Sequence, residues 1–460
     1  MRSPVVVIAI FTCATASADV GVRIGIENYA ALLSVSPGPR TGTTLVAGCL
    51  TSYTLSDPSG SSATAAGLLT GVLRGESWDA WSDTNQGNER GLACSAIARF
   101  DETGALYVTG IASEHVEIDG KTLSGGHAGD FGYIAKLDRL GGKVVWSHVA
   151  SSKVASWNEP TALALGPDHA LAVAGWFKDD IDWGAGRVAA RGSEDGYVIV
   201  LDRDTGAIRW TVASGKVAAL GFAPAGALVT AANIGMAHGS QLYVTAYEPR
   251  GTRLWQTHTS GSGDINAEAI AFAPDGDIAI VGSLRGAVTL GRKPLAQQAR
   301  PPGTQLPTWL DTDALALRLR PDGVLRTATT WQATEHGRLH GAAFVGDELW
   351  VGGTFRNHIA LDGTVLDAPT PKDDVAFVAR VTELGAVDRA ALLSLPDEPT
   401  EVSMFADGAD LVMSGTMLVE HPNKTADSFF LLRWNRSGAP PAATQLALPT
   451  ADRYLPHKPS

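Results

Sequence analysis

The sequence predicts an all-β fold, a seven-bladed β-propeller of four-stranded antiparallel blades, and three observations predict it. Four short strand signals recur seven times in a fixed order, the copies follow one another through short connections, and no long stretch shows a helical period. A repeat of about 60 residues is too small to be an independent β-sandwich of about 100 residues, the main rival. Neighbouring repeats must therefore stack, and four-stranded sheets stacked around an axis form a propeller.

Composition agrees with this class and narrows the choice of partners. The 460 residues include 51 glycines and 24 prolines, which indicates many turns and favours short strands. Hydrophobic residues make up 45% of the chain and charged residues 18%, a balance typical of globular proteins. The net charge of -12, with no cluster of Lys and Arg, excludes a nucleic-acid-binding surface.

The first two strands of each repeat, A and B, carry the clearest pattern. Strand A is an apolar stretch of period two that ends at a turn, and strand B follows at once and usually closes on glycine. The strand A copies are 30–42, 95–104, 161–170, 217–226, 268–276, 341–347 and 400–408. The strand B copies are 45–48, 107–110, 172–175, 228–233, 279–282, 350–353 and 412–415, and only 228–233 lacks the glycine.

Strands C and D complete each repeat after a segment of variable length. The tight turns between them are 138–142, 202–206, 248–251, 320–323, 382–385 and 435–438, all with turn-forming Gly or Asp chemistry. Strand D carries Trp146, Trp210 and Trp255 at one position of three successive repeats, so the register is not a product of composition.

These signals set the predicted boundaries. The propeller covers 19–447, and 448–460 form a flexible C-terminal tail. Its repeats run from about 28–85, 92–150, 158–214, 215–260, 264–331, 336–394 and 398–447. Residues 20–27 alternate like a strand, so we expect them to complete the last blade and close the ring.

The N-terminus reads as a signal peptide over 1–18. Arg2 precedes an apolar run at 5–11, and Ala16-Ser17-Ala18 form a small-residue cleavage site. We therefore expect an exported monomer in the periplasm, on the cell surface or outside the cell, without a membrane span. Lipidation of Cys13 is the alternative, although 10–12 lack the usual small residue.

Two cysteines remain after cleavage, Cys49 and Cys94. Their register places them on strands of adjacent repeats, in a compartment where disulfides persist. One disulfide and two separate buried thiols are both compatible with the sequence.

Some segments resemble known repeat families. Residues 100–110, Phe-Asp-Glu-Thr-Gly-Ala-Leu-Tyr-Val-Thr-Gly, followed by 129–138, resemble the bacterial SBBP-type β-propeller repeat. Residues 201–210, Leu-Asp-Arg-Asp-Thr-Gly-Ala-Ile-Arg-Trp, also resemble the PQQ-like repeat of quinoproteins and outer-membrane assembly lipoproteins. The resemblance, over about 28–447, implies an exported propeller and adds little on function.

The variable B–C segments and the D–A connections share one face, where we expect function. An insertion at 292–311 carries Trp309 among four prolines, which suits carbohydrate or protein contact, although a Trp that packs on its own blade is the alternative. Polar residues of the D–A connections would surround the channel mouth, where carboxylates and amides suit sugar hydroxyls or a cation. They are Asn88, Glu89, Asn158, Glu159, Asp264, Asn266, Glu268, His336, Arg338, Glu398 and Glu401.

Other polar motifs are better explained by structure. His336 and His340 approach a strand, where a spacing of four places them about 13 Å apart, so we expect capping or solvent-exposed histidines and no metal. Asp180 and Asp182 faintly suggest a calcium loop, but the equivalent segments favour a small hairpin turn. An Asp recurs before strand C as a structural turn residue, at 130, 195, 313, 374 and 427.

No nucleophile motif, phosphate loop or dinucleotide fingerprint is present, so we expect no cofactor. The quinoprotein interpretation would need eight blades and a pair of adjacent cysteines. The leading hypothesis is a non-catalytic propeller that binds a protein or glycan on its B–C/D–A face through Trp309, Glu89, Glu159, Asn266, Glu268, His336 and Arg338. The alternatives are a polysaccharide lyase or hydrolase with its site at the channel mouth, and a cell-envelope assembly scaffold.

Overall fold

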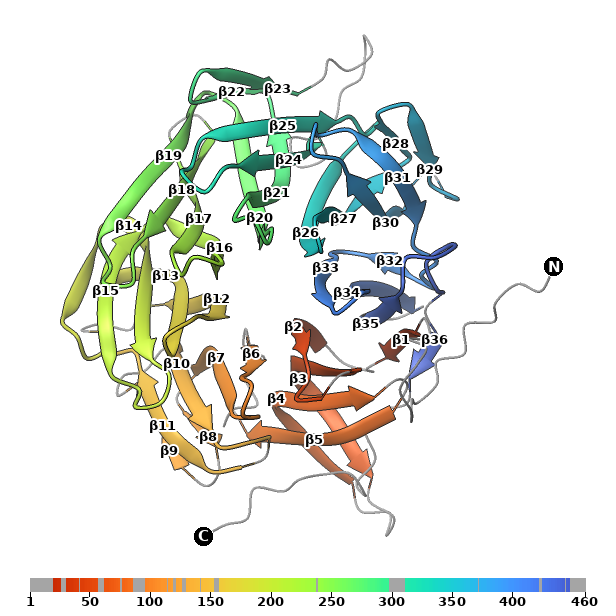
Figure 1. Cartoon of the computed structure of the whole chain (residues 1–460). Helices are drawn as coiled ribbons and strands as arrows, with labels where there is room; N and C mark the ends of the chain where they lie inside the picture. Colours follow the sequence, from red (N-terminus) through yellow and green to blue (C-terminus); the bar gives the residue numbers. More distant parts are fainter. Residues whose placement is uncertain are drawn as a thin grey trace.

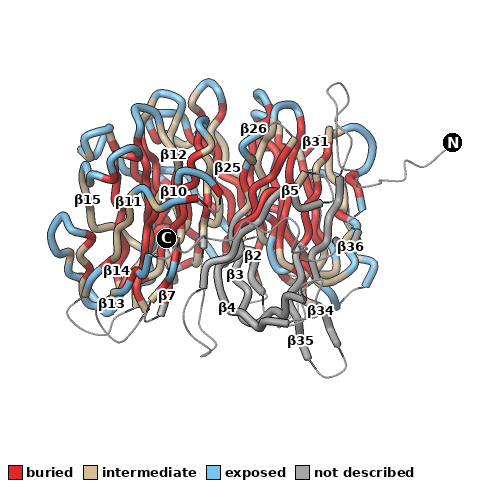
Figure 2. The backbone as a smooth tube through the Cα atoms, turned by 90° about the horizontal axis from the view of Figure 1, so that it is seen from below, coloured by how far each residue is buried: buried red, intermediate tan, exposed pale blue. Residues whose placement is uncertain are grey.

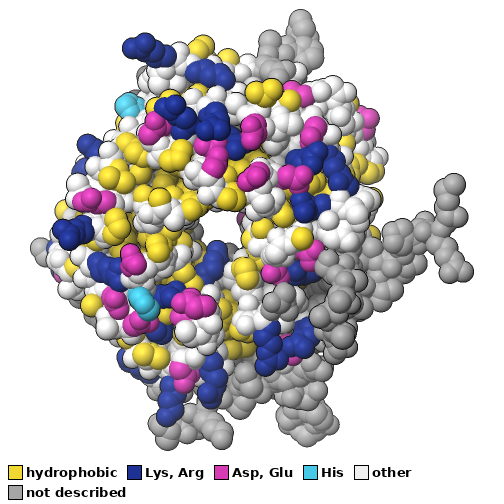
Figure 3. Space-filling view, viewed as in Figure 1, with side chains coloured by type: hydrophobic (Ala, Val, Ile, Leu, Met, Phe, Trp, Pro, Cys, Tyr) yellow, Lys and Arg dark blue, Asp and Glu magenta, His cyan; other side chains and the backbone are white. Residues whose placement is uncertain are grey.

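The computed structural model describes most of the chain from residue 20 to residue 446. The described ranges are 20–25, 30–40, 42–56, 62–74, 77–85, 96–113, 115–118, 121–125, 130–140, 142–152, 157–236, 239–297, 311–370, 372–421, 424–442 and 444–446. Within these ranges the fold is all-β, with 36 strands and no helix. The sheets stand around a central opening (Figure 1), which stays open in the space-filling view (Figure 3). This confirms an all-β, propeller-like fold.

The strands of the first three repeats pair in chain order. They are β2 (Ala30–Pro37), β3 (Thr43–Ser56), β4 (Ser62–Arg74) and β5 (Ser77–Asn85); β6 (Ala96–Phe100), β7 (Leu106–Ser113), β10 (Asp130–Leu137) and β11 (Val144–Val149); and β12 (Asn158–Leu165), β13 (Ala170–Asp182), β14 (Arg187–Asp202) and β15 (Ile208–Ser214). Each set is a four-stranded antiparallel sheet with its first strand nearest the opening (Figure 1).

The next three repeats follow the same order. They are β16 (Lys216–Phe222), β17 (Leu228–Gly235), β18 (Ser240–Tyr247) and β19 (Arg253–Gly261); β20 (Asp264–Phe272), β21 (Ile278–Arg285), β24 (Asp313–Leu319) and β25 (Leu325–Trp331); and β26 (Gly337–Val345), β27 (Glu348–Arg356), β30 (Asp374–Val381) and β31 (Val387–Leu392). The fourth and fifth sets join in one larger sheet, in which the only residue pair between β18 and β20 is Ser240 with Asp264.

Short hairpins lie inside the B–C segments of several repeats. Two are separate two-stranded sheets, β8 (Val116–Ile118) with β9 (Lys121–Leu123) and β28 (His358–Leu361) with β29 (Thr364–Asp367). The hairpin of β22 (Ala287–Leu290) and β23 (Lys293–Ala296) instead joins the fourth repeat, because β22 pairs with β19. In the third repeat β13 runs directly into β14, and Asp182 pairs with Arg187 across the turn. Asp182 accepts hydrogen bonds from the backbone of Gly184 and Gly186, so the expected hairpin turn is confirmed.

Both ends of the described chain meet in the last sheet. It contains β32 (Glu398–Pro399), β33 (Ser403–Asp407), β34 (Asp410–His421), β35 (Lys424–Trp434), β1 (Val20–Gly25) and β36 (Thr444–Leu446). β1 pairs with β35 in antiparallel register from Val20 with Arg433 to Gly25 with Ser428, and β36 pairs with β1 in parallel. The prediction that 20–27 join the last repeat is confirmed for Val20–Gly25.

The inner strands begin earlier than the sequence predicts. β12 starts at Asn158, β20 at Asp264 and β26 at Gly337, so Glu159, Asn266, Glu268 and Arg338 lie on inner strands and not on connecting loops. The reason is a β-bulge in each strand, at 160–162, 267–269 and 339–341. A bulge interrupts the alternation of side chains between the two faces of a sheet. The residues before each bulge therefore do not fit the period-two pattern from which the strand was predicted.

The core runs through the middle of the strands, and the turns at both ends are exposed (Figure 2). Apolar clusters join neighbouring repeats. Ala343 and Trp350 of the sixth repeat, for example, share one cluster with Met413 and Trp434 of the seventh. Among the described residues, neighbouring repeats thus bury apolar side chains against each other, in agreement with the stacking argument.

A recurring contact, which we call the indole latch, joins the second, third and fourth repeats to the repeats that follow them. The Nε1 of Trp146, Trp210 and Trp255 donates to the carbonyls of Arg203, Pro249 and Pro321, at 3.1, 3.0 and 2.9 Å, and each acceptor lies in the C–D turn of the following repeat. The glycine of the same turn lies against the indole face. The common position of the three tryptophans in strand D is thus confirmed.

Two later repeats replace the indole but keep the contact. Thr329 donates to the carbonyl of Gly385 at 2.9 Å, and Arg389 donates to that of Gly438 at 2.7 Å. The acceptor is here the glycine carbonyl of the next C–D turn, so a bond from strand D to that turn occurs at five successive junctions.

Several predicted features lie outside the described residues. These are the signal peptide 1–18 with Cys13, the tail 448–460, Asn88, Glu89, Cys94 and Trp309; of Cys49 only the backbone, in β3, is described. No helix in the described part is long and apolar enough to cross a membrane.

We expect Gly251→Ala to destabilise the protein more than Gly104→Ala. Both glycines have left-handed backbones, with φ of 87° and 85°, so each substitution costs about 1 to 2 kcal/mol. A Cβ at residue 251 would lie 2.7 Å from the Trp210 indole, whereas one at residue 104 would meet no atom within 4 Å. The latch therefore adds roughly 1 to 3 kcal/mol to the first variant only. Urea unfolding measures the difference, and equal losses would contradict the latch.

Candidate functional site

Five side chains at equivalent positions of the inner strands form what we call the channel ring. They are Glu159, Lys216, Asn266, Arg338 and Glu401, from the third to the seventh repeat. Lys216, Asn266 and Glu401 are exposed, and Glu159 and Arg338 are half-buried. From the third to the seventh repeat these positions carry a carboxylate, an ammonium, an amide, a guanidinium and a carboxylate group.

The glycines at the ends of the B strands show that the ring residues occupy equivalent positions in their repeats. A Cβ on Gly175, Gly282, Gly353 or Gly415 would overlap the carbonyl oxygen of Glu159, Asn266, Arg338 or Glu401, respectively. The inner strand approaches strand B too closely for any side chain there. In the fourth repeat Ala232, paired with Val217, stands where the others have glycine.

The bulge residues form a second level deeper in the channel. Thr161, Glu268 and His340 are the extra residues of their strands. Thr161 donates to the carbonyl of Val217 in the next repeat at 2.6 Å. Glu268 likewise reaches the next repeat, where its Oε2 bonds Nδ1 of His340.

His340 is held at both ring nitrogens. Nδ1 bonds Glu268, and Nε2 lies 2.9 Å from Oγ1 of Thr354. The order of carboxylate, imidazole and hydroxyl is that of a nucleophile relay, but Thr354 is only 2% exposed and no substrate reaches it. His340 therefore fixes Glu268, whose side chain is 27% exposed to the channel.

Glu401 faces the same pair from the seventh repeat. Its carboxyl accepts a hydrogen bond from Thr416 at 3.2 Å. The side chain is exposed, and desolvation by the residues around its carboxyl raises the pKa of Glu401. The charge of His340 acts to lower that pKa and the charge of Glu268 to raise it, so the three groups lie within electrostatic range of one another.

A buried polar group lies next to the ring, between the sixth and seventh repeats. Arg356 donates to Asp374 at 2.7 Å and to Glu398 at 3.2 Å, and Asp374 lies 3.4 Å from Nε2 of His336. His336 is 6% exposed, and its Nδ1 has no hydrogen-bond partner among the described residues. The expectation of a capping or solvent-exposed histidine is wrong, because the inner strand begins beside it and the next sheet covers it. His340 is not solvent-exposed either, since its side chain is 9% exposed.

Burial determines which of His336 and Asp374 is protonated as the pH falls. Desolvation, with Arg338 and Arg356 nearby, lowers the pKa of His336 to about 3. Desolvation raises the pKa of Asp374 to about 6 against the opposing charge of Arg356. The contact between them is therefore not an ion pair at neutral pH, because the imidazole is neutral. On acidification the folded protein protonates Asp374 first, whereas the unfolded chain protonates His336 first.

Two further polar features lack functional geometry. No group of three or more His, Cys, Asp or Glu residues in the described ranges has the arrangement of a metal site. Asp195, Asp313 and Asp374 are respectively within β14 and at the first positions of β24 and β30, and Asp195 and Asp313 are buried. Asp195 is bonded by Arg191, so its recurring position has a structural role there.

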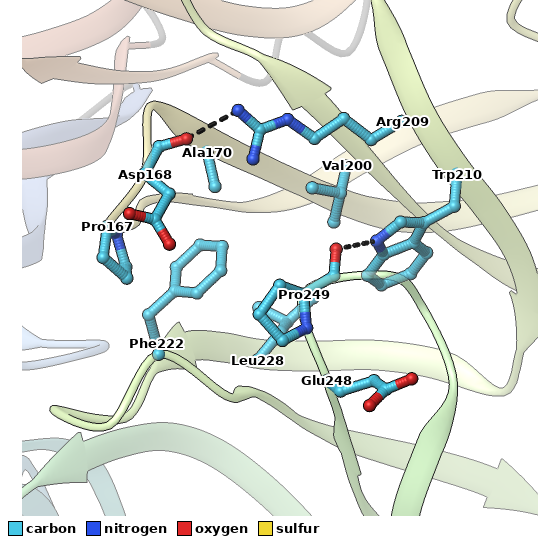
Figure 4. Close-up of a pocket in the computed structure, with 11 residues that line it drawn as sticks. Pro167, Asp168, Ala170, Val200, Arg209, Trp210, Phe222, Leu228, Glu248 and Pro249 are labelled. Atoms are coloured by element: carbon cyan, nitrogen blue, oxygen red, sulfur yellow. Dashed lines mark hydrogen bonds between the residues drawn. The ribbon is translucent and has the colours of Figure 1, made fainter.

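A hollow between the third and fourth repeats lies at the other end of the inner strands (Figure 4). Pro167, Asp168, Phe222 and Pro249 line it, and the Trp210 latch to Pro249 crosses one side. Arg209 closes another side through a 2.6 Å bond to the carbonyl of Asp168. The hollow is the space beside a latch, away from the face where the polar groups gather.

Two tryptophans that the sequence analysis did not single out adjoin the ring, and we call them the aromatic platform. The rings of Trp157 and Trp176 stack with centroids 6.1 Å apart and planes at 18°. Both are half-buried. Trp157 donates its indole N–H to Glu159 at 3.1 Å, and Nζ of Lys216 lies 4.2 Å from the Trp176 ring centre. Two ring residues therefore border the platform.

Of the predicted site residues, the structure places four around the channel. Glu159, Asn266 and Arg338 belong to the ring, and Glu268 lies one level deeper. His336 is buried beside them. His340 and Lys216 were not predicted as ligand-binding residues, and the only sequence signal for them is their equivalence to Glu268 and Glu159 in neighbouring repeats.

The pKa shifts of Asp374 and His336 predict how the free energy of unfolding of the variants His336→Asn and Asp374→Asn depends on pH. In His336→Asn, Asp374 retains its raised pKa, so stability present at low pH is lost as pH rises through about 6. In Asp374→Asn, His336 retains its lowered pKa, so stability present above about pH 6.5 is lost as pH falls toward 3. In the wild type these two effects oppose each other.

The measurement is the unfolding free energy from urea titrations at about pH 7 and about pH 4.5. Relative to the wild type, acidification should favour His336→Asn and disfavour Asp374→Asn. Shifts of the same sign in both variants would contradict the assignment of the proton.

Comparison with known proteins adds little beyond the fold. No protein-family model matches the sequence, so no model identifies the expected SBBP-type or PQQ-like repeats. No curated protein matches it either.

Solved structures with a similar arrangement include a quinohemoprotein alcohol dehydrogenase from Comamonas testosteroni, with a TM-score of 0.42 and 9% identity over 93% of this chain and 78% of that chain. The polysaccharide lyase Uly1 has a TM-score of 0.36 and 11% identity over 74% and 89%. A PL25 ulvan lyase bound to -[GlcA(1-4)Rha3S]- has a TM-score of 0.42 and 9% identity over 90% and 96%. Similarity at this level carries no argument about activity.

Proposed function

We propose that this protein is an exported seven-bladed β-propeller that binds a polysaccharide at the channel ring and hydrolyses it by acid–base catalysis. The seven strand sets and the pairing of β1 with β35 support the blade number. The signal sequence at 1–18 supports export.

One observation carries the catalytic part: Glu401 of the seventh repeat lies within electrostatic range of the Glu268–His340 pair of the adjacent fifth and sixth repeats. Glu401 has a raised pKa, and Glu268 is fixed by an imidazole that is itself fixed by Thr354. Glycoside hydrolysis needs one carboxyl group that holds a proton and a second that is ionised and oriented. A raised pKa on one carboxyl beside a second, oriented carboxyl is the arrangement that favours an acid–base site.

The roles follow from these environments. Glu401 donates its proton to the glycosidic oxygen, and the bond from that oxygen to the anomeric carbon breaks. Water attacks the anomeric carbon, forms the new C–O bond and gives a proton to Glu268. The departing chain carries the proton from Glu401, and solvent returns a proton from Glu268 to Glu401 before the next turnover.

Binding without catalysis is the second candidate function. The channel ring favours it, because its two carboxylates, two cations and one amide suit sugar hydroxyls without any reaction. Both nitrogens of His340 are also occupied, so the imidazole itself does not act as a base while these bonds persist. The two candidates differ in whether a bound glycan is cleaved.

Purified mature protein should release new reducing ends from one or more of xylan, laminarin, alginate and polygalacturonate. Glu401→Gln and Glu268→Gln should each lower kcat by about 100-fold or more while glycan binding persists. The matched control is Glu248→Gln, the same change in the C–D turn beside the hollow of Figure 4.

Full turnover in Glu401→Gln would contradict the assigned acid. Binding without new reducing ends would establish the non-catalytic candidate. Unsaturated, ultraviolet-absorbing products would indicate elimination by a lyase and contradict hydrolysis.

A further inference from the structure

The aromatic platform has the composition of a sugar subsite. Trp157 and Trp176 are half-buried and stack on each other on the face where the inner strands begin, and the ammonium group of Lys216 lies over the Trp176 ring. The apolar C–H face of a pyranose packs on an indole, while its hydroxyls need polar partners at the edge of the ring. Such partners are present, because Glu159 accepts the Trp157 indole N–H, Lys216 contacts Trp176 and Glu194 pairs with Lys216.

The rings are held in place before any ligand binds. Trp176 lies on β13 directly opposite Glu159 of β12. The carbonyl of Trp157 accepts a 2.9 Å hydrogen bond from the backbone of Lys178, and its indole N–H is satisfied by Glu159. A rigid aromatic contact loses little conformational entropy on binding, which favours affinity.

The charged partners form a connected set. Glu194 bridges Lys216 and Lys178, the latter at 3.6 Å. The pairing with Lys216 lowers the pKa of Glu194, so the carboxylate stays ionised and keeps Lys216 beside the Trp176 ring. Lys216 and Lys178 are about half-exposed, so both ammonium groups remain accessible to a ligand.

The platform also continues into the channel ring. Glu159 and Lys216 belong to the channel ring and contact the two tryptophans, so the platform and the ring share two polar side chains. Glu268, His340 and Glu401 lie farther round the same channel, in the fifth to seventh repeats.

We propose that the aromatic platform is a subsite that binds a pyranose unit of a linear glycan several units away from the residue at Glu268 and Glu401. This inference rests on the proposed function for the position of the reacting unit. It predicts that the platform acts on affinity for long chains and leaves the chemical step alone.

The experiment compares long and short oligosaccharides of whichever of xylan, laminarin, alginate and polygalacturonate retains the wild-type protein on an array. Trp157→Ala and Trp176→Ala should raise KM for the long oligosaccharide about tenfold, leave KM for the short one unchanged, and leave kcat unchanged. Trp157→Phe, which keeps an aromatic face, should restore most of the affinity.

Tyr243→Ala is the matched control, because Tyr243 stacks on His258 at 4.9 Å between β18 and β19, away from the inner strands. The control should bind both oligosaccharides normally. Direct binding is read from the quenching of tryptophan fluorescence, which does not depend on turnover.

Equal affinity of the wild type and both platform variants for the long chain would overturn the subsite. An equal loss for long and short chains, or a loss of kcat, would also overturn it. If long chains bind through the platform and no chain is cleaved, the hydrolytic function fails and the subsite stands. If the wild type binds none of the four polysaccharides, both proposals fail.

Discussion

The indole latch constrains every structure nearer to the axis. Each latch ties strand D of one repeat to the C–D turn of the next, and five successive junctions use the contact in some form. A sheet that cannot rotate about its neighbour delivers its inner strand to a fixed position at the channel. The distance between side chains on different inner strands, such as Glu268 and His340, is therefore set at the outer edge of the ring, far from the side chains themselves.

A second constraint acts at the inner edge. The glycine that closes strand B lets the inner strand approach it, and the bulge that follows supplies one extra residue per strand. That extra residue serves no ladder pairing, so its side chain is free to vary. It is Thr161 in the third repeat, where it bonds backbone carbonyls of its own and the next repeat, and Glu268 and His340 in the fifth and sixth. The same device gives a structural contact in one place and a titratable pair in another.

The features that recur from repeat to repeat could be predicted from the sequence, whereas the positions of the β-bulges could not. Glycines after strand B, Asp-Gly hairpins and the Trp146, Trp210 and Trp255 register depend on local turn chemistry, which a sequence displays directly. The relation of His336 to His340 depended on regular strand spacing, and the bulge between Leu339 and Gly341 removed that regularity. Trp157 and Trp176 meet because β12 pairs with β13 in a register that another bulge shifts, and no local pattern reports it.

Function in a repeated scaffold must come from positions where the repeats differ. At the bulge position the fourth repeat has Ala218, the third has Thr161, and acid or imidazole side chains occur only in the fifth and sixth among those described. The aromatic platform lies on the third repeat, whose bulge residue is the uncharged Thr161. A glycan bound from the platform to Glu401 would contact the polar side chains of the channel ring first. It would reach Glu401, the carboxyl group with the raised pKa, last. Affinity for the glycan and the chemical step therefore depend on different repeats. The third repeat would determine affinity and the fifth to seventh repeats the reaction, and the same contacts between repeats hold both in place.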